Sequence, residues 1–164
     1  MPDAHTELLQ QMAIFGGIRT DILLFLLERA NVVRVDADAY FFREGDFAQS
    51  MFVLETGRAA VLKLWRGEQH PLRTIEAGDC FGEMALMDMK SRSASVLAIE
   101  ACAAIELSAG CLFELYERDL EQFALIQMNM GREVSRRLRE TDDRLFASTM
   151  GSPCVDASHL LRAI

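Results

Sequence analysis

Two short stretches of this sequence carry side chains that could bind a small anionic ligand. Residues 81–86 read Phe-Gly-Glu-Met-Ala-Leu, and residues 92–96 read Arg-Ser-Ala-Ser-Val. An arginine presents a planar fork of donors that pairs bidentately with a phosphate. Glycine lets the backbone approach a ligand, the N–H groups that open a helical turn favour an anion, and a carboxylate accepts a hydrogen bond from a hydroxyl. Gly82, Glu83 and Arg92 therefore predict a site for a ligand that carries both a phosphate and a sugar hydroxyl.

The other reactive side chains show no catalytic or metal-binding pattern. The four cysteines, predicted to be buried reduced thiols, have no CxxC spacing, and the three histidines form neither HxH nor HExxH. Only His70 falls in the region predicted to be β-structure, whereas a metal-dependent enzyme of the cupin type needs a histidine-rich cluster inside its barrel. No nucleophile–base set is found either. We therefore expect neither an enzyme nor a metal site.

The bulk composition is that of about one soluble globular domain. The chain has 164 residues, of which 51% are hydrophobic and 26% charged, and its formal net charge is −8. Nucleic-acid binding requires clustered positive charge, so the acidic balance argues against it. No apolar run approaches the roughly 20 residues that a membrane span needs, and the N-terminus lacks a secretory pattern. We expect a cytoplasmic protein without a nucleic-acid or membrane partner.

Hydrophobic spacing divides the chain into helical ends and a β-rich middle. Apolar residues recur at three- and four-residue steps over residues 5–16 and 20–30, which predicts two short helices, the second capped by Thr20 or Asp21. Between residues 31 and 107, short β-type runs alternate with turns, a pattern typical of a jelly roll with Greek-key connections. The predicted fold class is mixed α+β, a β jelly roll flanked by N-terminal helices and a long C-terminal dimerisation helix.

Helices are predicted again after the β-rich region. Ser108 can cap a helix over 109–116, and a longer helix runs from about 119 to 146, followed by the linker Ala-Ser-Thr-Met-Gly-Ser-Pro and a possible short helix over 155–164. The long helix would measure roughly 40 Å, more than one small roll can cover. Its heptad seam favours pairing with a second copy, and packing on its own roll is the alternative. The seam comprises Leu120, Ala124, Gln127, Gly131, Val134, Leu138, Thr141 and Leu145.

The two ligand-binding stretches and an upstream motif resemble the cyclic nucleotide-binding domain family, especially the effector domain of bacterial catabolite activator proteins. That family's phosphate-binding cassette reads F-G-E-hydrophobic-A-L and then R-[ST]-A-[ST]-V, as do residues 81–86 and 92–96. An F-x-E-G-D motif, a strand and a turn glycine are matched by residues 42–46, 51–54 and Gly57. The full cassette with this glycine frame is a specific signature.

The resemblance implies the roles of the site residues. Glu83 would bind the ribose hydroxyl and Arg92 the phosphate, and Ser93 favours cAMP, because cGMP-binding domains often carry threonine there. In catabolite activator proteins a threonine and the opposite subunit's serine reach the adenine. Thr141 and Asp142 occupy those positions here, and the aspartate leaves the base preference open. The implied ligand-binding residues are Phe81, Gly82, Glu83, Met84, Ala85, Arg92, Ser93, Thr141 and Asp142.

The predicted function is a stand-alone, homodimeric cyclic nucleotide sensor that signals to an unknown protein. The alternatives are a ligand-free dimerisation module of the same fold and the effector half of a transcription regulator. The short stretch after the long helix leaves no room for a helix-turn-helix module. Glu83 and Arg92 could also form a plain structural ion pair. The predicted parts are N-terminal helices over 1–30, a β-roll over 31–108 with the cassette at 80–96, hinge and dimerisation helices over 109–148, and a tail over 149–164.

Overall fold

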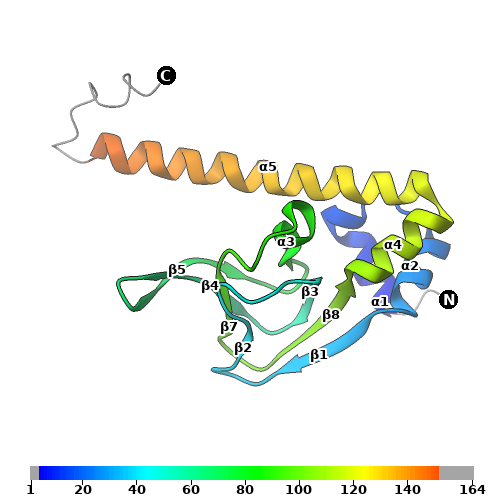
Figure 1. Cartoon of the computed structure of the whole chain (residues 1–164), viewed down its shortest axis with the longest axis horizontal. Helices are drawn as coiled ribbons and strands as arrows, with labels where there is room; N and C mark the ends of the chain where they lie inside the picture. The colour runs from blue at the N-terminus through cyan, green and yellow to red at the C-terminus, as the bar shows by residue number, and fades with distance from the viewer. Residues whose placement is uncertain (1–3, 152–164) are drawn as a thin grey trace. The chain divides into compact units, whose positions relative to one another are not determined.

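A computed structural model describes residues 4–151, and the chain divides into two compact units, residues 1–130 and 131–164. Figure 1 shows the chain with most of its helices and strands labelled. The helices are α1 (Ala4–Gln11), the 3₁₀-helix η1 (Ala13–Phe15), α2 (Thr20–Leu27), α3 (Glu83–Asp88), α4 (Ala109–Arg118) and α5 (Leu120–Gly151). The strands are β1 (Asn31–Val35), β2 (Tyr40–Phe42), β3 (Ser50–Thr56), β4 (Ala59–Trp65), β5 (Glu68–Ile75), β6 (Cys80–Phe81), β7 (Ser95–Ala98) and β8 (Cys102–Ser108).

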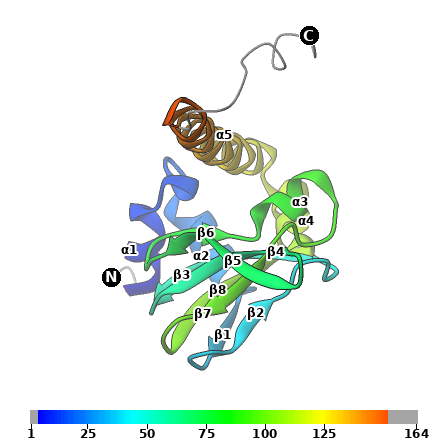
Figure 2. The ribbon, with the colours of Figure 1, turned by 90° about the vertical axis from the view of Figure 1, so that its left-hand side faces the viewer.

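Within the described residues, eight strands form two antiparallel four-stranded sheets, in the orders β1-β8-β3-β6 and β2-β7-β4-β5 (Figure 2). Most neighbours in a sheet are distant in sequence, so the chain crosses repeatedly between the sheets, as in a jelly roll. The predicted fold class is therefore confirmed, with helices before the roll and a long helix after it.

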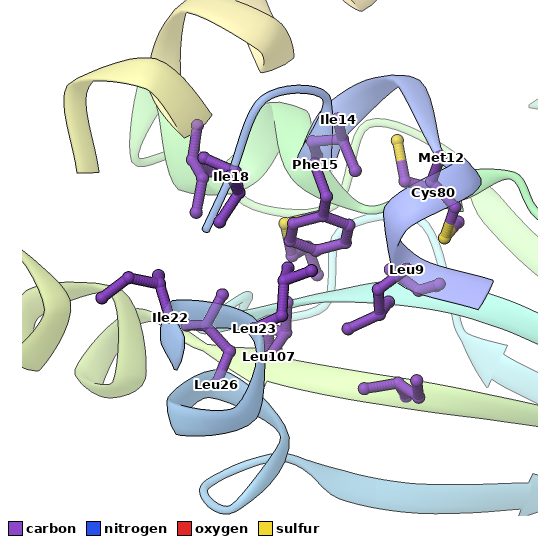
Figure 3. Close-up of a cluster of buried hydrophobic side chains, with 14 of the residues drawn as sticks. Leu9, Met12, Ile14, Phe15, Ile18, Ile22, Leu23, Leu26, Cys80 and Leu107 are labelled. Atoms are coloured by element: carbon purple, nitrogen blue, oxygen red, sulfur yellow. The ribbon is translucent and has the colours of Figure 1, made fainter. Parts of the chain in front are cut away.

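Strand β3 separates two hydrophobic cores because its alternate side chains point to opposite faces. Met51 and Val53 join a core built largely from the N-terminal helices, whereas Phe52 and Leu54 pack with side chains of both sheets. Figure 3 shows the first core, where Phe15 lies among side chains of α1, η1 and α2. A strand that is buried on both faces reads as a continuous apolar run, which explains why residues 51–54 show no alternation.

The cap predicted for the second helix is wrong. Arg19 occupies the N-cap position of α2, and no side chain makes a cap hydrogen bond there. The Arg19 backbone N–H instead donates to Gln122 Oε1 at 2.8 Å, and Thr20 Oγ1 accepts from Gln10 Nε2 at 3.1 Å. Asp21 Oδ1 accepts from Arg19 Nε at 3.0 Å, so both predicted capping side chains bond other side chains instead of the first N–H groups of α2. The predicted Ser108 cap of α4 is confirmed, since Ser108 Oγ accepts from the Cys111 N–H at 3.1 Å.

The long helix also ends later than its sequence predicts. It continues past Phe146 to Gly151, so the linker expected over residues 147–151 is wrong. No proline occurs before Pro153 in this part of the chain, and Thr149 Oγ1 donates to the Leu145 carbonyl at 2.9 Å, a bond that helices accommodate. The predicted helix over 155–164 lies outside the described residues.

The first turns of α5 are held by the helices before the roll. Asn129 Nδ2 donates to the carbonyls of Ile14 (3.1 Å) and Gly16 (2.9 Å), and Arg19 Nη2 donates to Asp119 Oδ2 at 2.8 Å. Cys80, Cys102 and Cys111 are buried thiols, as expected, and Cys154 lies outside the described residues. Over the part of the chain that the structure describes, no helix is long and apolar enough to span a bilayer.

Candidate ligand-binding site

Arg92 is the central side chain of the candidate site. It lies in the loop between α3 and β7 and is only 5% exposed. Its Nη1 donates to the Gly82 carbonyl at 2.9 Å, its Nη2 donates to Ser50 Oγ at 3.4 Å, and its Cζ lies 4.0 Å from the centroid of the Phe42 ring. Among residues 4–151 the guanidinium forms no ion pair, and its Nε has no hydrogen-bond partner. Ion pairing with Glu83 therefore does not account for its burial.

A buried guanidinium without a bonded carboxylate is electrostatically expensive. Burial lowers the pKa of Arg92, and the more distant carboxylates of Glu106, Asp46 and Glu83 act in the opposite direction. Arginine nevertheless stays protonated in proteins. The loop therefore holds a permanent positive charge in a poorly solvated position, where an anion would be bound strongly.

Gly82 is required by both backbone conformation and space. Its φ of +77° lies in the left-handed region, which favours glycine. A Cβ at this position would lie 2.6 Å from Arg92 Nη1 and 3.4 Å from Phe42 Cε1. The missing side chain is what lets the guanidinium approach the backbone at the start of α3.

Helix α3 carries the acidic residue of the candidate site. Glu83 is the first residue of α3 and is 2% exposed, and Ala85 is also buried, whereas Met84 is 47% exposed. The N-cap residue of α3 is Gly82, which makes no side-chain cap hydrogen bond. Phe81, which precedes them, lies in the core with its ring stacked on Phe52 at a centroid distance of 5.3 Å.

The upstream F-x-E-G-D motif supports the arginine from the other side. The Arg92 backbone N–H donates to the Asp46 carbonyl at 2.9 Å, and the Gly45 N–H donates to the Arg92 carbonyl at 2.9 Å. Ser95 Oγ, which is buried, accepts from the Glu44 N–H at 2.9 Å. Two sequence motifs almost fifty positions apart are thereby joined into one structure.

The remaining predicted site residues lie at the surface. Ser93 is exposed, and its carbonyl accepts from Lys63 Nζ at 2.6 Å. Thr141 and Asp142 are exposed on the part of α5 that belongs to the second unit, where Thr141 Oγ1 donates to the Arg137 carbonyl at 2.9 Å. The structure brings Gly82, Glu83 and Arg92 together in the first unit, and the roles of Thr141 and Asp142 stay predictions.

Sequence reasoning missed two contributors to this site. Ser50 supplies a buried acceptor to Arg92, and Lys63 contacts the loop that follows it. A lone serine before an apolar strand and a lone lysine within one carry no local signal. Their roles arise from strand pairing that brings together residues 30 to 42 positions apart.

Comparison with known proteins identifies the family. The model of the cyclic nucleotide-binding domain matches residues 32–119, more than half of the chain. This segment contains every residue described above for the first unit's site. The chain therefore belongs to the cyclic nucleotide-binding domain family.

Several relatives share part of their sequence with this chain. The cyclic AMP receptor protein of Thermus thermophilus is 30% identical over 102 residues, which cover 62% of this chain and 45% of that protein. Human cGMP-dependent protein kinase 2 is 28% identical over 155 residues, or 92% of this chain and 20% of the kinase. The chain thus spans less than half the length of these relatives.

Solved structures agree with the fold. The catabolite activator protein of Thermus thermophilus superposes with a TM-score of 0.72 at 25% identity, over 84% of this chain and 63% of that one. A cyclic nucleotide-binding domain from Methylobacillus flagellatus superposes with a TM-score of 0.79 at 22% identity, over 92% of this chain and 85% of that one. The second likeness shows the fold alone.

Proposed function

We propose that this chain is a regulatory module that binds cAMP and signals as a homodimer to a protein partner. The observation that carries the proposal is the buried Arg92 guanidinium, which has no ion pair among residues 4–151 and an Nε without a partner. Such a group gains most from an anion that enters the site, because the anion supplies both the missing charge and the missing acceptor. A cyclic phosphodiester has one negative charge, which matches one arginine.

The residues around Arg92 complete the proposed contacts. The backbone N–H groups at the start of α3 would donate to the same phosphate, and the Glu83 carboxylate would accept a hydrogen bond from the ribose 2′-hydroxyl. Each charge-assisted hydrogen bond contributes about 1.5–3 kcal/mol net. Three or four such bonds, less the cost of association, give micromolar affinity.

The choice of cAMP rests on Ser93 and on the relatives. Ser93 resembles the residue at this position in cAMP-binding cassettes, and one relative is named a cyclic AMP receptor protein. In this proposal the base lies near Thr141 and the partner copy's helix. By the resemblance to catabolite activator proteins, the Asp142 carboxylate of the partner copy would accept a hydrogen bond from the adenine amino group.

The proposed dimer uses the outer part of α5. Leu138 and Leu145 are seven residues apart, on one face of the helix, and are 59% and 65% exposed in the single chain. Apolar residues at heptad spacing are buried when two helices pair. Ligand binding would change this dimer surface, which the partner protein would recognise.

Isothermal titration calorimetry with cAMP and cGMP tests the ligand. We expect micromolar affinity for cAMP, weaker affinity for cGMP, and a loss of more than about a hundredfold in Arg92→Ala, which removes two charge-assisted bonds. Arg92→Lys keeps the charge but not the planar fork and should fall in between. Arg58→Ala is the control, because it removes an equal charge from an exposed ion pair with Glu100. Wild-type protein that gives no heat at millimolar cAMP would refute the proposal.

Sedimentation equilibrium tests the dimer. Leu138→Lys and Leu145→Lys should each shift the protein towards monomer, whereas Met150→Lys should not, because Met150 is exposed but lies off this seam. A dimer in wild-type protein together with no ligand binding would favour the ligand-free dimerisation module. A wild-type monomer would rule out dimer signalling.

A further inference from the structure

Lys63 forms a bridge that no sequence motif predicts. Its Nζ, on strand β4, donates to Glu44 Oε1 at 2.5 Å and to the Ser93 carbonyl at 2.6 Å. The other carboxylate oxygen, Glu44 Oε2, accepts from the Leu64 backbone N–H at 3.0 Å. One ion pair therefore links strand β4, the turn between β2 and β3, and the loop that carries Arg92.

The loop that carries Arg92 needs such support. We define the arginine segment as residues 90–95, and none of the chain's three prolines lies in it. Ser91 and Ser93 are exposed, and Met89 just before the segment is 92% exposed with a φ of +55°. The segment has no regular secondary structure before Ser95. Apart from the Lys63 bridge, the arginine segment is bonded to residues 44–46, in the turn between β2 and β3.

The geometry makes Glu44 the common anchor. Its N–H donates to Ser95 Oγ at one end of the arginine segment, and its carboxylate holds the lysine that contacts Ser93. Hydrogen bonds from Lys63 and from the Leu64 N–H lower the pKa of Glu44, so the carboxylate stays ionised well below neutral pH. Arg92 directly precedes Ser93, the nearer of these two attachment points, and its own backbone is bonded to Gly45 and Asp46.

We propose that the Lys63–Glu44 pair positions the arginine segment and thereby sets the ligand affinity of the site. Lys63 is a positioning residue, because it acts on the backbone that carries Arg92 and not on Arg92 itself. The ligand part of this inference rests on the proposed function. The effect of the Lys63–Glu44 pair on the arginine segment of the ligand-free protein does not rest on the proposed function.

Calorimetry with cAMP tests the ligand part. Lys63→Met keeps the aliphatic stem but loses the charge, and we expect an affinity about three- to tenfold weaker, since the pair is partly exposed. Lys63→Arg should restore affinity to within about twofold, because a guanidinium can reach the same two acceptors. Glu44→Gln should weaken affinity similarly, and the double variant should lose no more than either single one.

Lys90→Met is the matched control. Lys90, the only other lysine in the chain, lies within the arginine segment, and among residues 4–151 only its backbone N–H is bonded, to Asp88 Oδ1 at 3.1 Å. If Lys90→Met weakens cAMP binding as much as Lys63→Met does, general charge attraction explains the loss and the positioning role is wrong. Unchanged affinity in Lys63→Met also overturns it.

Amide hydrogen exchange on the ligand-free protein tests the bridge by itself. In Lys63→Met we expect the Arg92 amide, which donates to Asp46, to exchange at least several-fold faster, while amides in the β3–β8 pair keep their wild-type rates. Unchanged exchange at Arg92 would overturn the inference even if the chain binds cAMP. Faster exchange in a chain that binds no cAMP would retain the bridge and reject only the proposed ligand.

Discussion

Replacing Gly82 by alanine tests how tightly the site depends on its missing side chain. The φ of +77° would cost an L-residue about 1–2 kcal/mol. The new Cβ would also lie 2.6 Å from Arg92 Nη1. The guanidinium can relieve this contact only by moving, and that movement breaks its 2.9 Å bond to the Gly82 carbonyl. Loss of a charge-assisted bond costs about 1.5–3 kcal/mol.

The two contributions together predict a loss of about 2.5–5 kcal/mol in the free energy of unfolding of Gly82→Ala. Urea denaturation followed by circular dichroism measures this change directly. Because the displaced guanidinium is the proposed phosphate ligand, cAMP affinity in calorimetry should fall at least tenfold as well.

Gly67→Ala provides the matched control. Gly67 has a similar φ of +86°, but its Cβ would meet nothing within 4 Å. The free energy of unfolding of Gly67→Ala should fall only by the conformational cost of about 1–2 kcal/mol, and the variant should keep its ligand affinity. If the two variants lose equal stability and bind cAMP equally well, the close approach of Arg92 to the backbone has no energetic role, and our account of the site fails.

Three further changes test other parts of the first unit and its junction with the second. Thr6→Val should stabilise the protein by about 1 kcal/mol in urea denaturation, because the buried Thr6 hydroxyl has no hydrogen-bond partner among residues 4–151. Hydrogen bonds from the Gln122 N–H and from Arg19 lower the pKa of Asp119. The contribution of Asp119 to stability is therefore full above its unfolded pKa and is lost as the pH falls through its folded pKa. In acid denaturation, Asp119→Asn should therefore show a weaker loss of stability below about pH 4 than wild-type protein. Gly131→Ala should raise the melting temperature, with a gain of about 0.5–1 kcal/mol in the free energy of unfolding, because Gly131 lies inside α5 and an added Cβ would meet no heavy atom within 4 Å. A lower melting temperature would mean that the helix needs glycine at this position.

Much of the fold could be predicted because its signals are local. Periodic apolar residues predicted the helices before the roll, and turn residues between short apolar runs predicted the strands. The N-cap of α4 was correct because Ser108 bonds a backbone N–H three residues away. The N-cap of α2 was wrong because Thr20 instead accepts from Gln10, ten positions away, and the Arg19 N–H donates to Gln122, 103 positions away. Local patterns do not reveal contacts at that distance.

The candidate site divides in the same way. Gly82 and Glu83 could be identified because a glycine followed by an acidic helix start is a local signal. The ring of Phe42 under Arg92 and the acceptor on Ser50 come from other strands. Strand order and register bring them to the guanidinium, and these are set by the packing of two cores and not by neighbouring residues.

The sequence by itself determined which side chains could bind a phosphate and a sugar hydroxyl, because those chemical properties belong to the residues and to their close spacing. Only the tertiary structure decided that Arg92 is buried without an ion pair among residues 4–151, and that Lys63 and Glu44 hold the segment around it. The physical reason is that desolvation and charge pairing depend on every group nearby in space. For Arg92, those groups come from strands far apart in the chain.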